Sequence, residues 1–217
     1  ERIARFMRAP AVLTFSTGYQ VNVGVLSCLL GRQDVAVLDA MDHASIIDGI
    51  RLGFGRSVKY KHNDMADLES KLANIPEDKM RMHICWASTM GPHHEDVPLI
   101  DIVDIILGAR PMAFSFPGAN PRHAHEWKIW RDVKLPDGKV IIPGVIDTTS
   151  NFVEHPELVS DRIQNYASVV GRENVMVGGD CGFGTFAGRV QVDRNIVWMK
   201  FAAMTEGARM ASEVLWN

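Results

Sequence analysis

The chain has 217 residues, of which 47% are hydrophobic and 23% are charged, and these values are close to those of ordinary globular proteins, so disorder is not expected. Its formal net charge of -3 gives no electrostatic basis for binding nucleic acid or an anionic membrane. No apolar run is long enough to span a bilayer, and the length suits one large domain or two small ones.

The start of the sequence and its cysteines indicate the cellular compartment of the protein. The opening "ERIARFMRAP" lacks the apolar core of a secretory signal, and because Glu1 lies within a helix-like segment, we expect the sequence to be a fragment. Cys28, Cys85 and Cys181 are too few and too scattered for a disulfide framework. We therefore expect a reducing, cytoplasmic setting, and Cys28 is interpreted as a small hydrophobic residue.

Short β-rich runs alternate with amphipathic helical segments along the chain. Strands are predicted at 11–16, 35–40, 57–62, 80–86, 111–116, 139–147 and 174–180. Helices are predicted at 18–31, 43–55, 64–75, 96–109, 123–133 and 155–171, and from Asp193 towards the end of the chain. This alternation predicts an α/β fold of repeated βα units, with a parallel sheet or barrel and the helices outside it.

Helix boundary signals support two of these helices. Asp96 is expected to cap a helix that has Pro98 in its first turn and that ends at Gly108. Pro156 opens a second helix, which is expected to end at Gly171. The apolar stripes of both helices are interpreted as surfaces that face the core.

The residues best suited to chemistry stand where strands end. His83 and Cys85 are two positions apart, so they face the same way along a strand. Asp147 and the Asp180-Cys181 pair follow later strands, and the carboxyl ends of parallel strands share one edge. Two thiols and an imidazole make a plausible zinc site, but spacing alone leaves buried structural residues as an equal alternative.

A fourth zinc ligand is not obvious from the sequence. The candidates are His123, His125 and Glu126 in "HAHEW", and Glu154 and His155 in "FVEH". Some of these residues are expected to be solvated positions at the start of a helix. A fourth position without a protein ligand would also suit catalysis, since a substrate thiol bound there would lose its proton at neutral pH.

Gly18 and Tyr19 in "FSTGYQ" lie at a strand-to-helix turn. Such a turn can bind phosphate through free backbone N–H groups, but it is more often an ordinary βα turn. His43, at the end of the next strand, could stack on a flat ring or cap the following helix.

Residues 1 to about 79 resemble the α-oxoamine synthases, which are pyridoxal-phosphate enzymes. The matching run is "LTFSTGYQVNVGVLSCLLGRQDVAVLDAMDHASIIDGIRLGFGRSVKYKHNDMADLESKLANIPEDK". The resemblance implies that Gly18 and Tyr19 lie at the cofactor and that His43 stacks on its pyridine ring. The family's Schiff-base lysine and its aspartate for the pyridine nitrogen would lie downstream, where no matching motif follows. Covalent pyridoxal-phosphate chemistry is therefore not expected.

Residues from about 80 to 217 resemble the C-terminal part of the cobalamin-independent methionine synthases. The matching runs are "HICWASTMGPHHEDVPL", "AFSFPGANPRHAHEW", "LPDGKVIIPGVIDTTSNFVEHPELV" and "VMVGGDCGFGTFAG". The resemblance implies half of a TIM-type barrel, with zinc held by His83, Cys85, Cys181 and a glutamate. Pro117 stands at the position of that glutamate and cannot coordinate a metal. Glu126 or a neighbouring histidine then substitutes for it, or the site is weak or empty.

These observations predict two segments, 1–79 and 80–217, and a zinc-dependent module that transfers a methyl group from a small-molecule donor to a homocysteine-like thiol. Asp147 and Asp180 would support the ligands or contact the substrate. A fragment of a pyridoxal-phosphate-dependent acyltransferase and a non-catalytic hybrid of the two families are the alternatives. The chain would accordingly be a natural fusion, an assembly artefact or a deliberate chimera.

Overall fold

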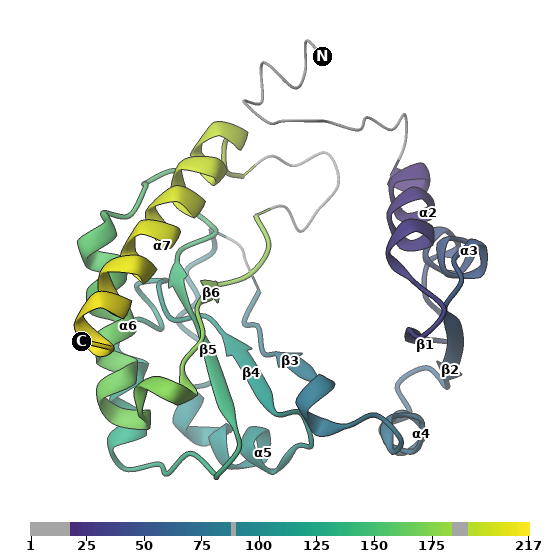
Figure 1. Ribbon diagram of the computed structural model, residues 1–217, viewed down its shortest axis with the longest axis horizontal. Coiled ribbons are helices and arrows are strands. Elements are labelled where there is room, and N and C mark those ends of the chain that lie inside the picture. Colours follow the sequence, from purple (N-terminus) through teal and green to yellow (C-terminus); the bar gives the residue numbers. More distant parts are fainter. Residues whose placement is uncertain (1–17, 88–89, 184–190) are drawn as a thin grey trace. The chain divides into compact units, whose positions relative to one another are not determined.

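The computed structural model describes residues 18–87, 90–183 and 191–217 (Figure 1). The strand predicted at 11–16 lies outside these residues. The contacts divide the chain into two compact units, Glu1–Pro76 and Glu77–Asn217. This division falls close to the boundary predicted between residues 79 and 80.

The first unit alternates helices with two short parallel strands. Its elements are α2 (Gly18–Leu29), β1 (Val35–Asp39), α3 (Ala44–Leu52), β2 (Arg56–Tyr60) and α4 (Met65–Leu72). Strands β1 and β2 pair in parallel, with Val37 opposite Val58. Leu38 and Ile50 are buried and supply the apolar centre of this small unit.

The second unit is built on a four-stranded parallel sheet in the order β3-β4-β5-β6 (Figure 1). Its elements are β3 (Arg81–His83), α5 (Val103–Gly108), β4 (Ala113–Phe116), β5 (Val140–Ile146), α6 (Pro156–Val170), β6 (Gly178–Gly179) and α7 (Arg194–Leu215). The strands follow chain order and helices connect them, which is the arrangement of half a TIM-type barrel. The predicted α/β fold of repeated βα units with a C-terminal half-barrel is confirmed.

Two apolar clusters hold this sheet to its helices. One surrounds Phe114 and Phe116 of β4 and includes Trp130 and Tyr166. The other joins β5 to α6 and α7; its buried members are Val145, Ile146, Val159, Ile163 and Ala211. β5 is buried along most of its length, as expected for a central parallel strand that is covered by helices.

Helix α6 follows its sequence signals closely. It starts at Pro156, where a missing backbone N–H has no cost, and it ends before Gly171, whose φ of 89° lies in the region that favours glycine. α6 also lies unusually close to α7, because a Cβ added at Gly207 would come within 2.5 Å of the Cβ of Val159. The predicted helix at 155–171 is therefore correct, including both ends.

The predicted cap at Asp96 is wrong. A 3-10 helix occupies Leu99–Asp101, and α5 begins only at Val103. The backbone N–H of Leu99 donates to the carboxylate of Glu126, at 2.8 Å, so a residue distant in the sequence supplies the cap. The helix predicted at 123–133 is likewise reduced to a 3-10 helix at Glu126–Arg131.

Among the helices of the described residues, none combines the length and the apolar character needed to cross a membrane.

Candidate metal centre

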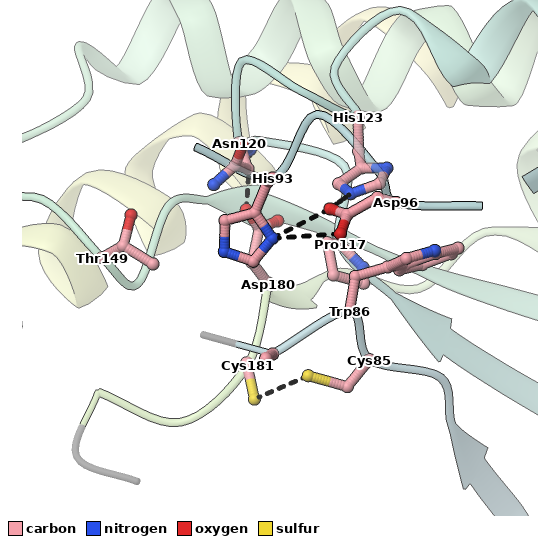
Figure 2. A pocket seen from close by; sticks show the side chains of 11 residues that line it. Cys85, Trp86, His93, Asp96, Pro117, Asn120, His123, Thr149, Asp180 and Cys181 are labelled. Atoms are coloured by element: carbon pink, nitrogen blue, oxygen red, sulfur yellow. Dashed lines mark hydrogen bonds and ion pairs between the residues drawn. The ribbon is translucent and has the colours of Figure 1, made fainter. Parts of the chain in front are cut away.

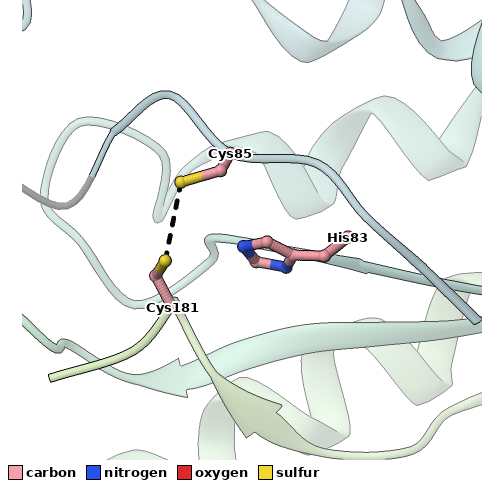
Figure 3. A group of neighbouring side chains, drawn as sticks. All are labelled: His83, Cys85 and Cys181. Carbon is pink, nitrogen blue, oxygen red and sulfur yellow. Dashed lines mark hydrogen bonds between the residues drawn. The ribbon is translucent and has the colours of Figure 1, made fainter. Parts of the chain in front are cut away.

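His83, Cys85 and Cys181 meet at the carboxyl edge of the sheet. His83 is the last residue of β3 and Cys85 follows it, while Cys181 comes just after β6. One ligand atom from each of the three residues lies within 4.8 Å of the other two (Figure 3). In the described part of the chain, no other set of three or more His, Cys, Asp or Glu residues meets this condition. The topology thus joins residues that are far apart in the sequence.

The spacing of the two sulfur atoms fits a shared metal ion. Cys85 Sγ and Cys181 Sγ are 3.6 Å apart, and both cysteines are free thiols. A disulfide would require about 2.05 Å. Two thiolates on a tetrahedral zinc, each with a Zn–S distance of about 2.3 Å, would be about 3.8 Å apart. The observed separation therefore suits metal binding with little rearrangement.

His83 is oriented for coordination by a neighbour on β4. Its Nδ1 atom lies 3.1 Å from the hydroxyl oxygen of Ser115, which leaves Nε2 as the nitrogen available to a metal. Figure 3 shows one ring nitrogen turned towards the two sulfur atoms. Burial lowers the pKa of His83 and so favours the neutral form that can act as a ligand.

The Cys85 thiol holds its proton more tightly than an ordinary thiol does. Burial and the hydrogen bond with Cys181 raise the pKa of Cys85 above its ordinary value. Metal binding at a thiol of this kind displaces the proton. We therefore expect metal binding at this centre to strengthen as pH rises.

Asp180 ties the end of β6 to the loop that follows β4. Its carboxylate accepts hydrogen bonds from the backbone N–H groups of Gly118, Ala119 and Asn120, at 2.7–2.8 Å. Burial raises its pKa to about 6, although these three hydrogen bonds act in the opposite direction. Only glycine fits at position 144, because a Cβ there would lie 1.9 Å from Oδ1 of Asp180. Asp180 thereby fixes the backbone from which Cys181 projects.

Asp147 organises the loop after β5 in the same way. It is buried, and its Oδ1 accepts hydrogen bonds from the backbone N–H of Thr149, at 3.0 Å, and from its hydroxyl group, at 2.8 Å. The backbone N–H of Asp147 donates to Glu154, at 2.7 Å, and Glu154 forms an ion pair with the fully buried Lys200, at 2.8 Å. These contacts favour a positioning role for Asp147 over direct contact with a substrate.

A pocket opens beside the metal centre (Figure 2). It is lined by Cys85, Trp86, Ala87, His93, Asp96, Pro117, Asn120, His123, Thr149, Asp180 and Cys181. Pro117 is buried in its wall and offers no side-chain ligand atom. Both cysteines and several polar side chains therefore line the same small space.

The candidates for the fourth ligand have other contacts. Glu126 is buried, and its two carboxylate oxygens lie 2.8 Å from the Leu99 backbone nitrogen and 2.8 Å from His123 Nδ1. Its role as a metal ligand stays a prediction. His125 is exposed, whereas His155 caps α6 by accepting a hydrogen bond from the backbone of Glu157.

The sequence analysis missed the functional environment of Asp96. His93 lies 2.9 Å and His123 lies 3.2 Å from the same carboxylate oxygen of Asp96. The available signal was the three-residue spacing of His93 and Asp96, repeated by His123 and Glu126. Either pair alone resembles an ordinary surface feature, and only the fold brings the two pairs together.

The residues predicted to bind pyridoxal phosphate lie in the first unit. Gly18 is the first residue of α2, and the hydroxyl group of Tyr19 donates to the carboxylate of Asp48. His43 is the N-cap of α3 and accepts a hydrogen bond from the backbone N–H of Ser45, at 3.2 Å. The capping geometry therefore accounts for His43 within the unit, and the cofactor role of the three residues stays a prediction.

Two family models match different parts of the chain. Residues 1–106 match the family described as "Aminotransferase class I and II". Residues 126–204 match the family described as "Cobalamin-independent synthase, Catalytic domain". The double resemblance predicted from the sequence is confirmed, although the first match extends beyond the boundary that we predicted.

Curated relatives of the first segment cover only part of the chain. A serine palmitoyltransferase from Sphingobacterium spiritivorum is 47% identical over 81 residues, which are 37% of this chain and 20% of that protein. A putative 8-amino-7-oxononanoate synthase from Bacillus subtilis subsp. natto is 44% identical over 105 residues, which are 48% of this chain and 28% of that protein. The chain thus spans between a fifth and a third of the length of these relatives.

Among solved structures, a B12-independent methionine synthase from Shewanella sp. W3-18-1, in complex with selenomethionine, is similar in fold. The TM-score is 0.55 at 14% identity, and the match covers 93% of this chain and 57% of that structure. At this identity the similarity describes the fold alone.

Proposed function

We propose that residues 77–217 form a zinc-dependent module that binds a small thiol of the homocysteine type and transfers a methyl group to it. The observation that carries this proposal is the convergence of one imidazole and two thiols, within 4.8 Å, beside a polar pocket. The match to the cobalamin-independent synthase family supports it.

The donor set fits zinc better than the other common metals. Two sulfur ligands and one nitrogen ligand are typical of zinc, whereas magnesium and calcium prefer oxygen. With three protein ligands, zinc would hold a substrate thiol in its fourth position and make it nucleophilic at neutral pH. Glu126 stays a predicted ligand; its two oxygens lie 2.8 Å from the Leu99 backbone nitrogen and 2.8 Å from His123 Nδ1, so it would exchange one of these contacts for the metal.

The protein's own residues orient the reacting groups. His83 and Cys85 project from the end of β3, and Cys181 is fixed by the hydrogen bonds of its neighbour Asp180. Asp147 holds Thr149 at the pocket wall, where its side chain can contact the substrate. The methyl donor would enter from the open side of the same pocket.

Three free cysteines, of which Cys28 and Cys85 are exposed, favour a reducing compartment, so we place the protein in the cytoplasm. We expect pyridoxal phosphate to form no covalent bond with the chain. The segment that matches the serine palmitoyltransferase and the putative 8-amino-7-oxononanoate synthase covers 20% and 28% of their lengths.

The zinc content of the full chain, purified without added metal, tests the proposal. We expect one zinc per wild-type chain, an unchanged content in the Cys28→Ser variant, and a strong loss in Cys181→Ser. A content that is the same in all three proteins would contradict the proposal. Mass spectrometry of homocysteine incubated with the protein and a panel of methyl donors then tests methyl transfer. Zinc binding without any methylated product would favour the non-catalytic hybrid.

A further inference from the structure

Two free thiols meet where the two end strands of the sheet converge. Strands β3 and β6 stand at opposite ends of the order β3-β4-β5-β6, and Cys85 and Cys181 follow these two strands. Their sulfur atoms are 3.6 Å apart, although 96 positions separate the two residues in the sequence (Figure 3). The fold therefore brings two thiols from distant parts of the chain into contact.

The segment that carries Cys85 is held on both sides. The backbone N–H of Ile84 donates to the carbonyl oxygen of Ser115, at 2.8 Å. The indole N–H of Trp86 donates to the carbonyl oxygen of Val97, at 2.7 Å. Because both neighbours are anchored, the sulfur of Cys85 is kept close to the end of β6.

The two neighbours of Cys181 differ in how tightly they are held. Asp180 is buried and accepts hydrogen bonds from three backbone N–H groups of the loop after β4. At Gly182, by contrast, an added Cβ would meet no atom of the described residues within 4 Å. A disulfide requires the sulfur atoms to approach by about 1.5 Å. Rotation of the two side chains, with a small backbone shift beside Gly182, can supply this movement.

A small molecule in solution can reach the pair. Cys85 is exposed, Cys181 is half-buried, and both line the pocket. An adduct formed at Cys85 therefore meets the thiol of Cys181 without a search through the chain. This proximity favours closure of the pair over reaction with a second molecule from solution.

We propose that Cys85 and Cys181 are a redox-modification site, which closes to a disulfide when the metal-free chain meets a small disulfide such as oxidised glutathione. The Cys85 thiolate attacks one sulfur of oxidised glutathione and releases one glutathione thiolate, which takes up the proton of Cys85. The Cys181 thiolate then attacks the Cys85 sulfur and releases the second glutathione, which takes up the other proton. The two cysteines are oxidised, and one oxidised glutathione is reduced to two glutathione thiols.

The disulfide and the proposed metal centre exclude each other. A metal ion binds thiolates, and a disulfide has none to offer. Oxidation would thus remove two of the three proposed zinc ligands, and reduction would restore them. Formation of the disulfide does not depend on zinc; only this regulatory consequence rests on the proposed function.

Peptide mapping of the metal-free full chain, equilibrated in glutathione redox buffers, tests the inference. After acid quenching and alkylation of the remaining thiols, we expect a cross-linked Cys85–Cys181 peptide, with Cys28 alkylated. This cross-link should exceed any pairing with Cys28 by about tenfold or more, and dithiothreitol should reverse it. Cys28→Ser is the matched control and should give the same cross-link. Cys181→Ser should instead carry glutathione on Cys85.

The decisive result comes from the wild-type chain, so it does not depend on whether a variant folds. A wild-type map with only glutathione adducts, or with cross-links to Cys28 as frequent as the Cys85–Cys181 cross-link, would overturn the inference. Zinc added before oxidation separates the inference from the proposed function. If both hold, zinc suppresses the cross-link. A cross-link that forms equally with and without zinc would support the disulfide site and contradict the zinc centre.

Discussion

Pro117 is the residue that most limits the metal centre. It lines the pocket with Cys85 and Cys181, and it stands where the resemblance to methionine synthases implies a glutamate ligand. Because it is buried at the end of β4, a side chain at this position is already directed by the sheet. The three proposed ligands lie at the end of β3 or just after β3 and β6, and Pro117 offers no side-chain atom for a fourth.

A glutamate at this position should strengthen zinc binding. We predict that Pro117→Glu raises the affinity for zinc by about tenfold or more, because it adds an anionic oxygen ligand beside the two thiols. Pro117→Ala is the matched control and should leave the affinity near that of wild type. Competition with a chromophoric chelator measures the zinc affinity of both variants. Equal affinities in the two variants would place Pro117 outside the coordination sphere.

His123 should make stability depend on pH. Its pKa in the folded chain is raised above the ordinary value, so protonated His123 stabilises the fold. This contribution is fully present below the unfolded pKa of about 6.5 and is lost as pH rises through the folded pKa. Urea unfolding across this pH range measures the difference in unfolding free energy between wild type and His123→Gln. This difference should shrink towards alkaline pH. A difference that is constant with pH would show that folding does not shift the pKa of His123.

At the scale of elements, α7 is attached to the loop after β5 by a buried ion pair. Lys200 is fully buried and lies 2.8 Å from Glu154, which also accepts the backbone N–H of Asp147. Arg162 of α6 lies at 4.0 Å from the same carboxylate. Lys200 is thus linked through Glu154 and Asp147 to Thr149, which lines the pocket.

Removing one partner of this pair should be costly. We predict that Lys200→Met lowers the free energy of unfolding by about 3–5 kcal/mol, since it leaves Glu154 buried without its main counter-charge. Lys79→Met, at an exposed position, should have little effect. The double variant Lys200→Met/Glu154→Gln should recover part of the loss. Denaturant unfolding measures the stability of all three variants. A small effect of Lys200→Met would contradict the predicted contribution of the buried ion pair.

Elements with local signals were predictable, and those that depend on distant contacts were not. α6 is delimited by Pro156 and Gly171, both of which act through their own backbone. The start of the segment before α5 depends instead on Glu126, whose carboxylate takes the place expected of Asp96. A local pattern cannot reveal a cap that comes from another part of the chain.

In the candidate site, too, some contacts were predictable from the sequence and others were not. The convergence of His83, Cys85 and Cys181 followed from strand spacing and from the common edge of a parallel sheet. The contacts of His93 and His123 with the same oxygen of Asp96 did not, because loops that are distant in the sequence bring these residues together in the folded chain. The topology of a parallel sheet predicts which residues meet at its strand ends. Contacts between side chains of different loops can be found only in the three-dimensional structure.

At the scale of the whole molecule, the contacts divide the chain into two compact units, and two family models match residues 1–106 and 126–204. All three proposed metal ligands belong to the second unit, Glu77–Asn217. The residues predicted to contact pyridoxal phosphate all belong to the first. Zinc should therefore act on the stability of one unit only.

We predict two thermal transitions in calorimetry of the full chain, of which zinc raises one. Zinc at about a thousand times its dissociation constant should stabilise the second unit by roughly 4 kcal/mol. Cys181→Ser should abolish this shift, whereas Tyr19→Phe, in the first unit, should preserve it. A single transition that zinc moves as a whole would show that the two units unfold together.

X-ray absorption at the zinc edge of the full chain tests the central claim most directly. Our account predicts two sulfur atoms at about 2.3 Å and one imidazole nitrogen at about 2.0 Å from the metal. It also predicts that the residual zinc held by Cys181→Ser has one sulfur ligand, whereas the zinc in Cys28→Ser has two. A wild-type spectrum with only nitrogen and oxygen ligands, or a sulfur count unchanged in Cys181→Ser, would contradict the metal centre of His83, Cys85 and Cys181.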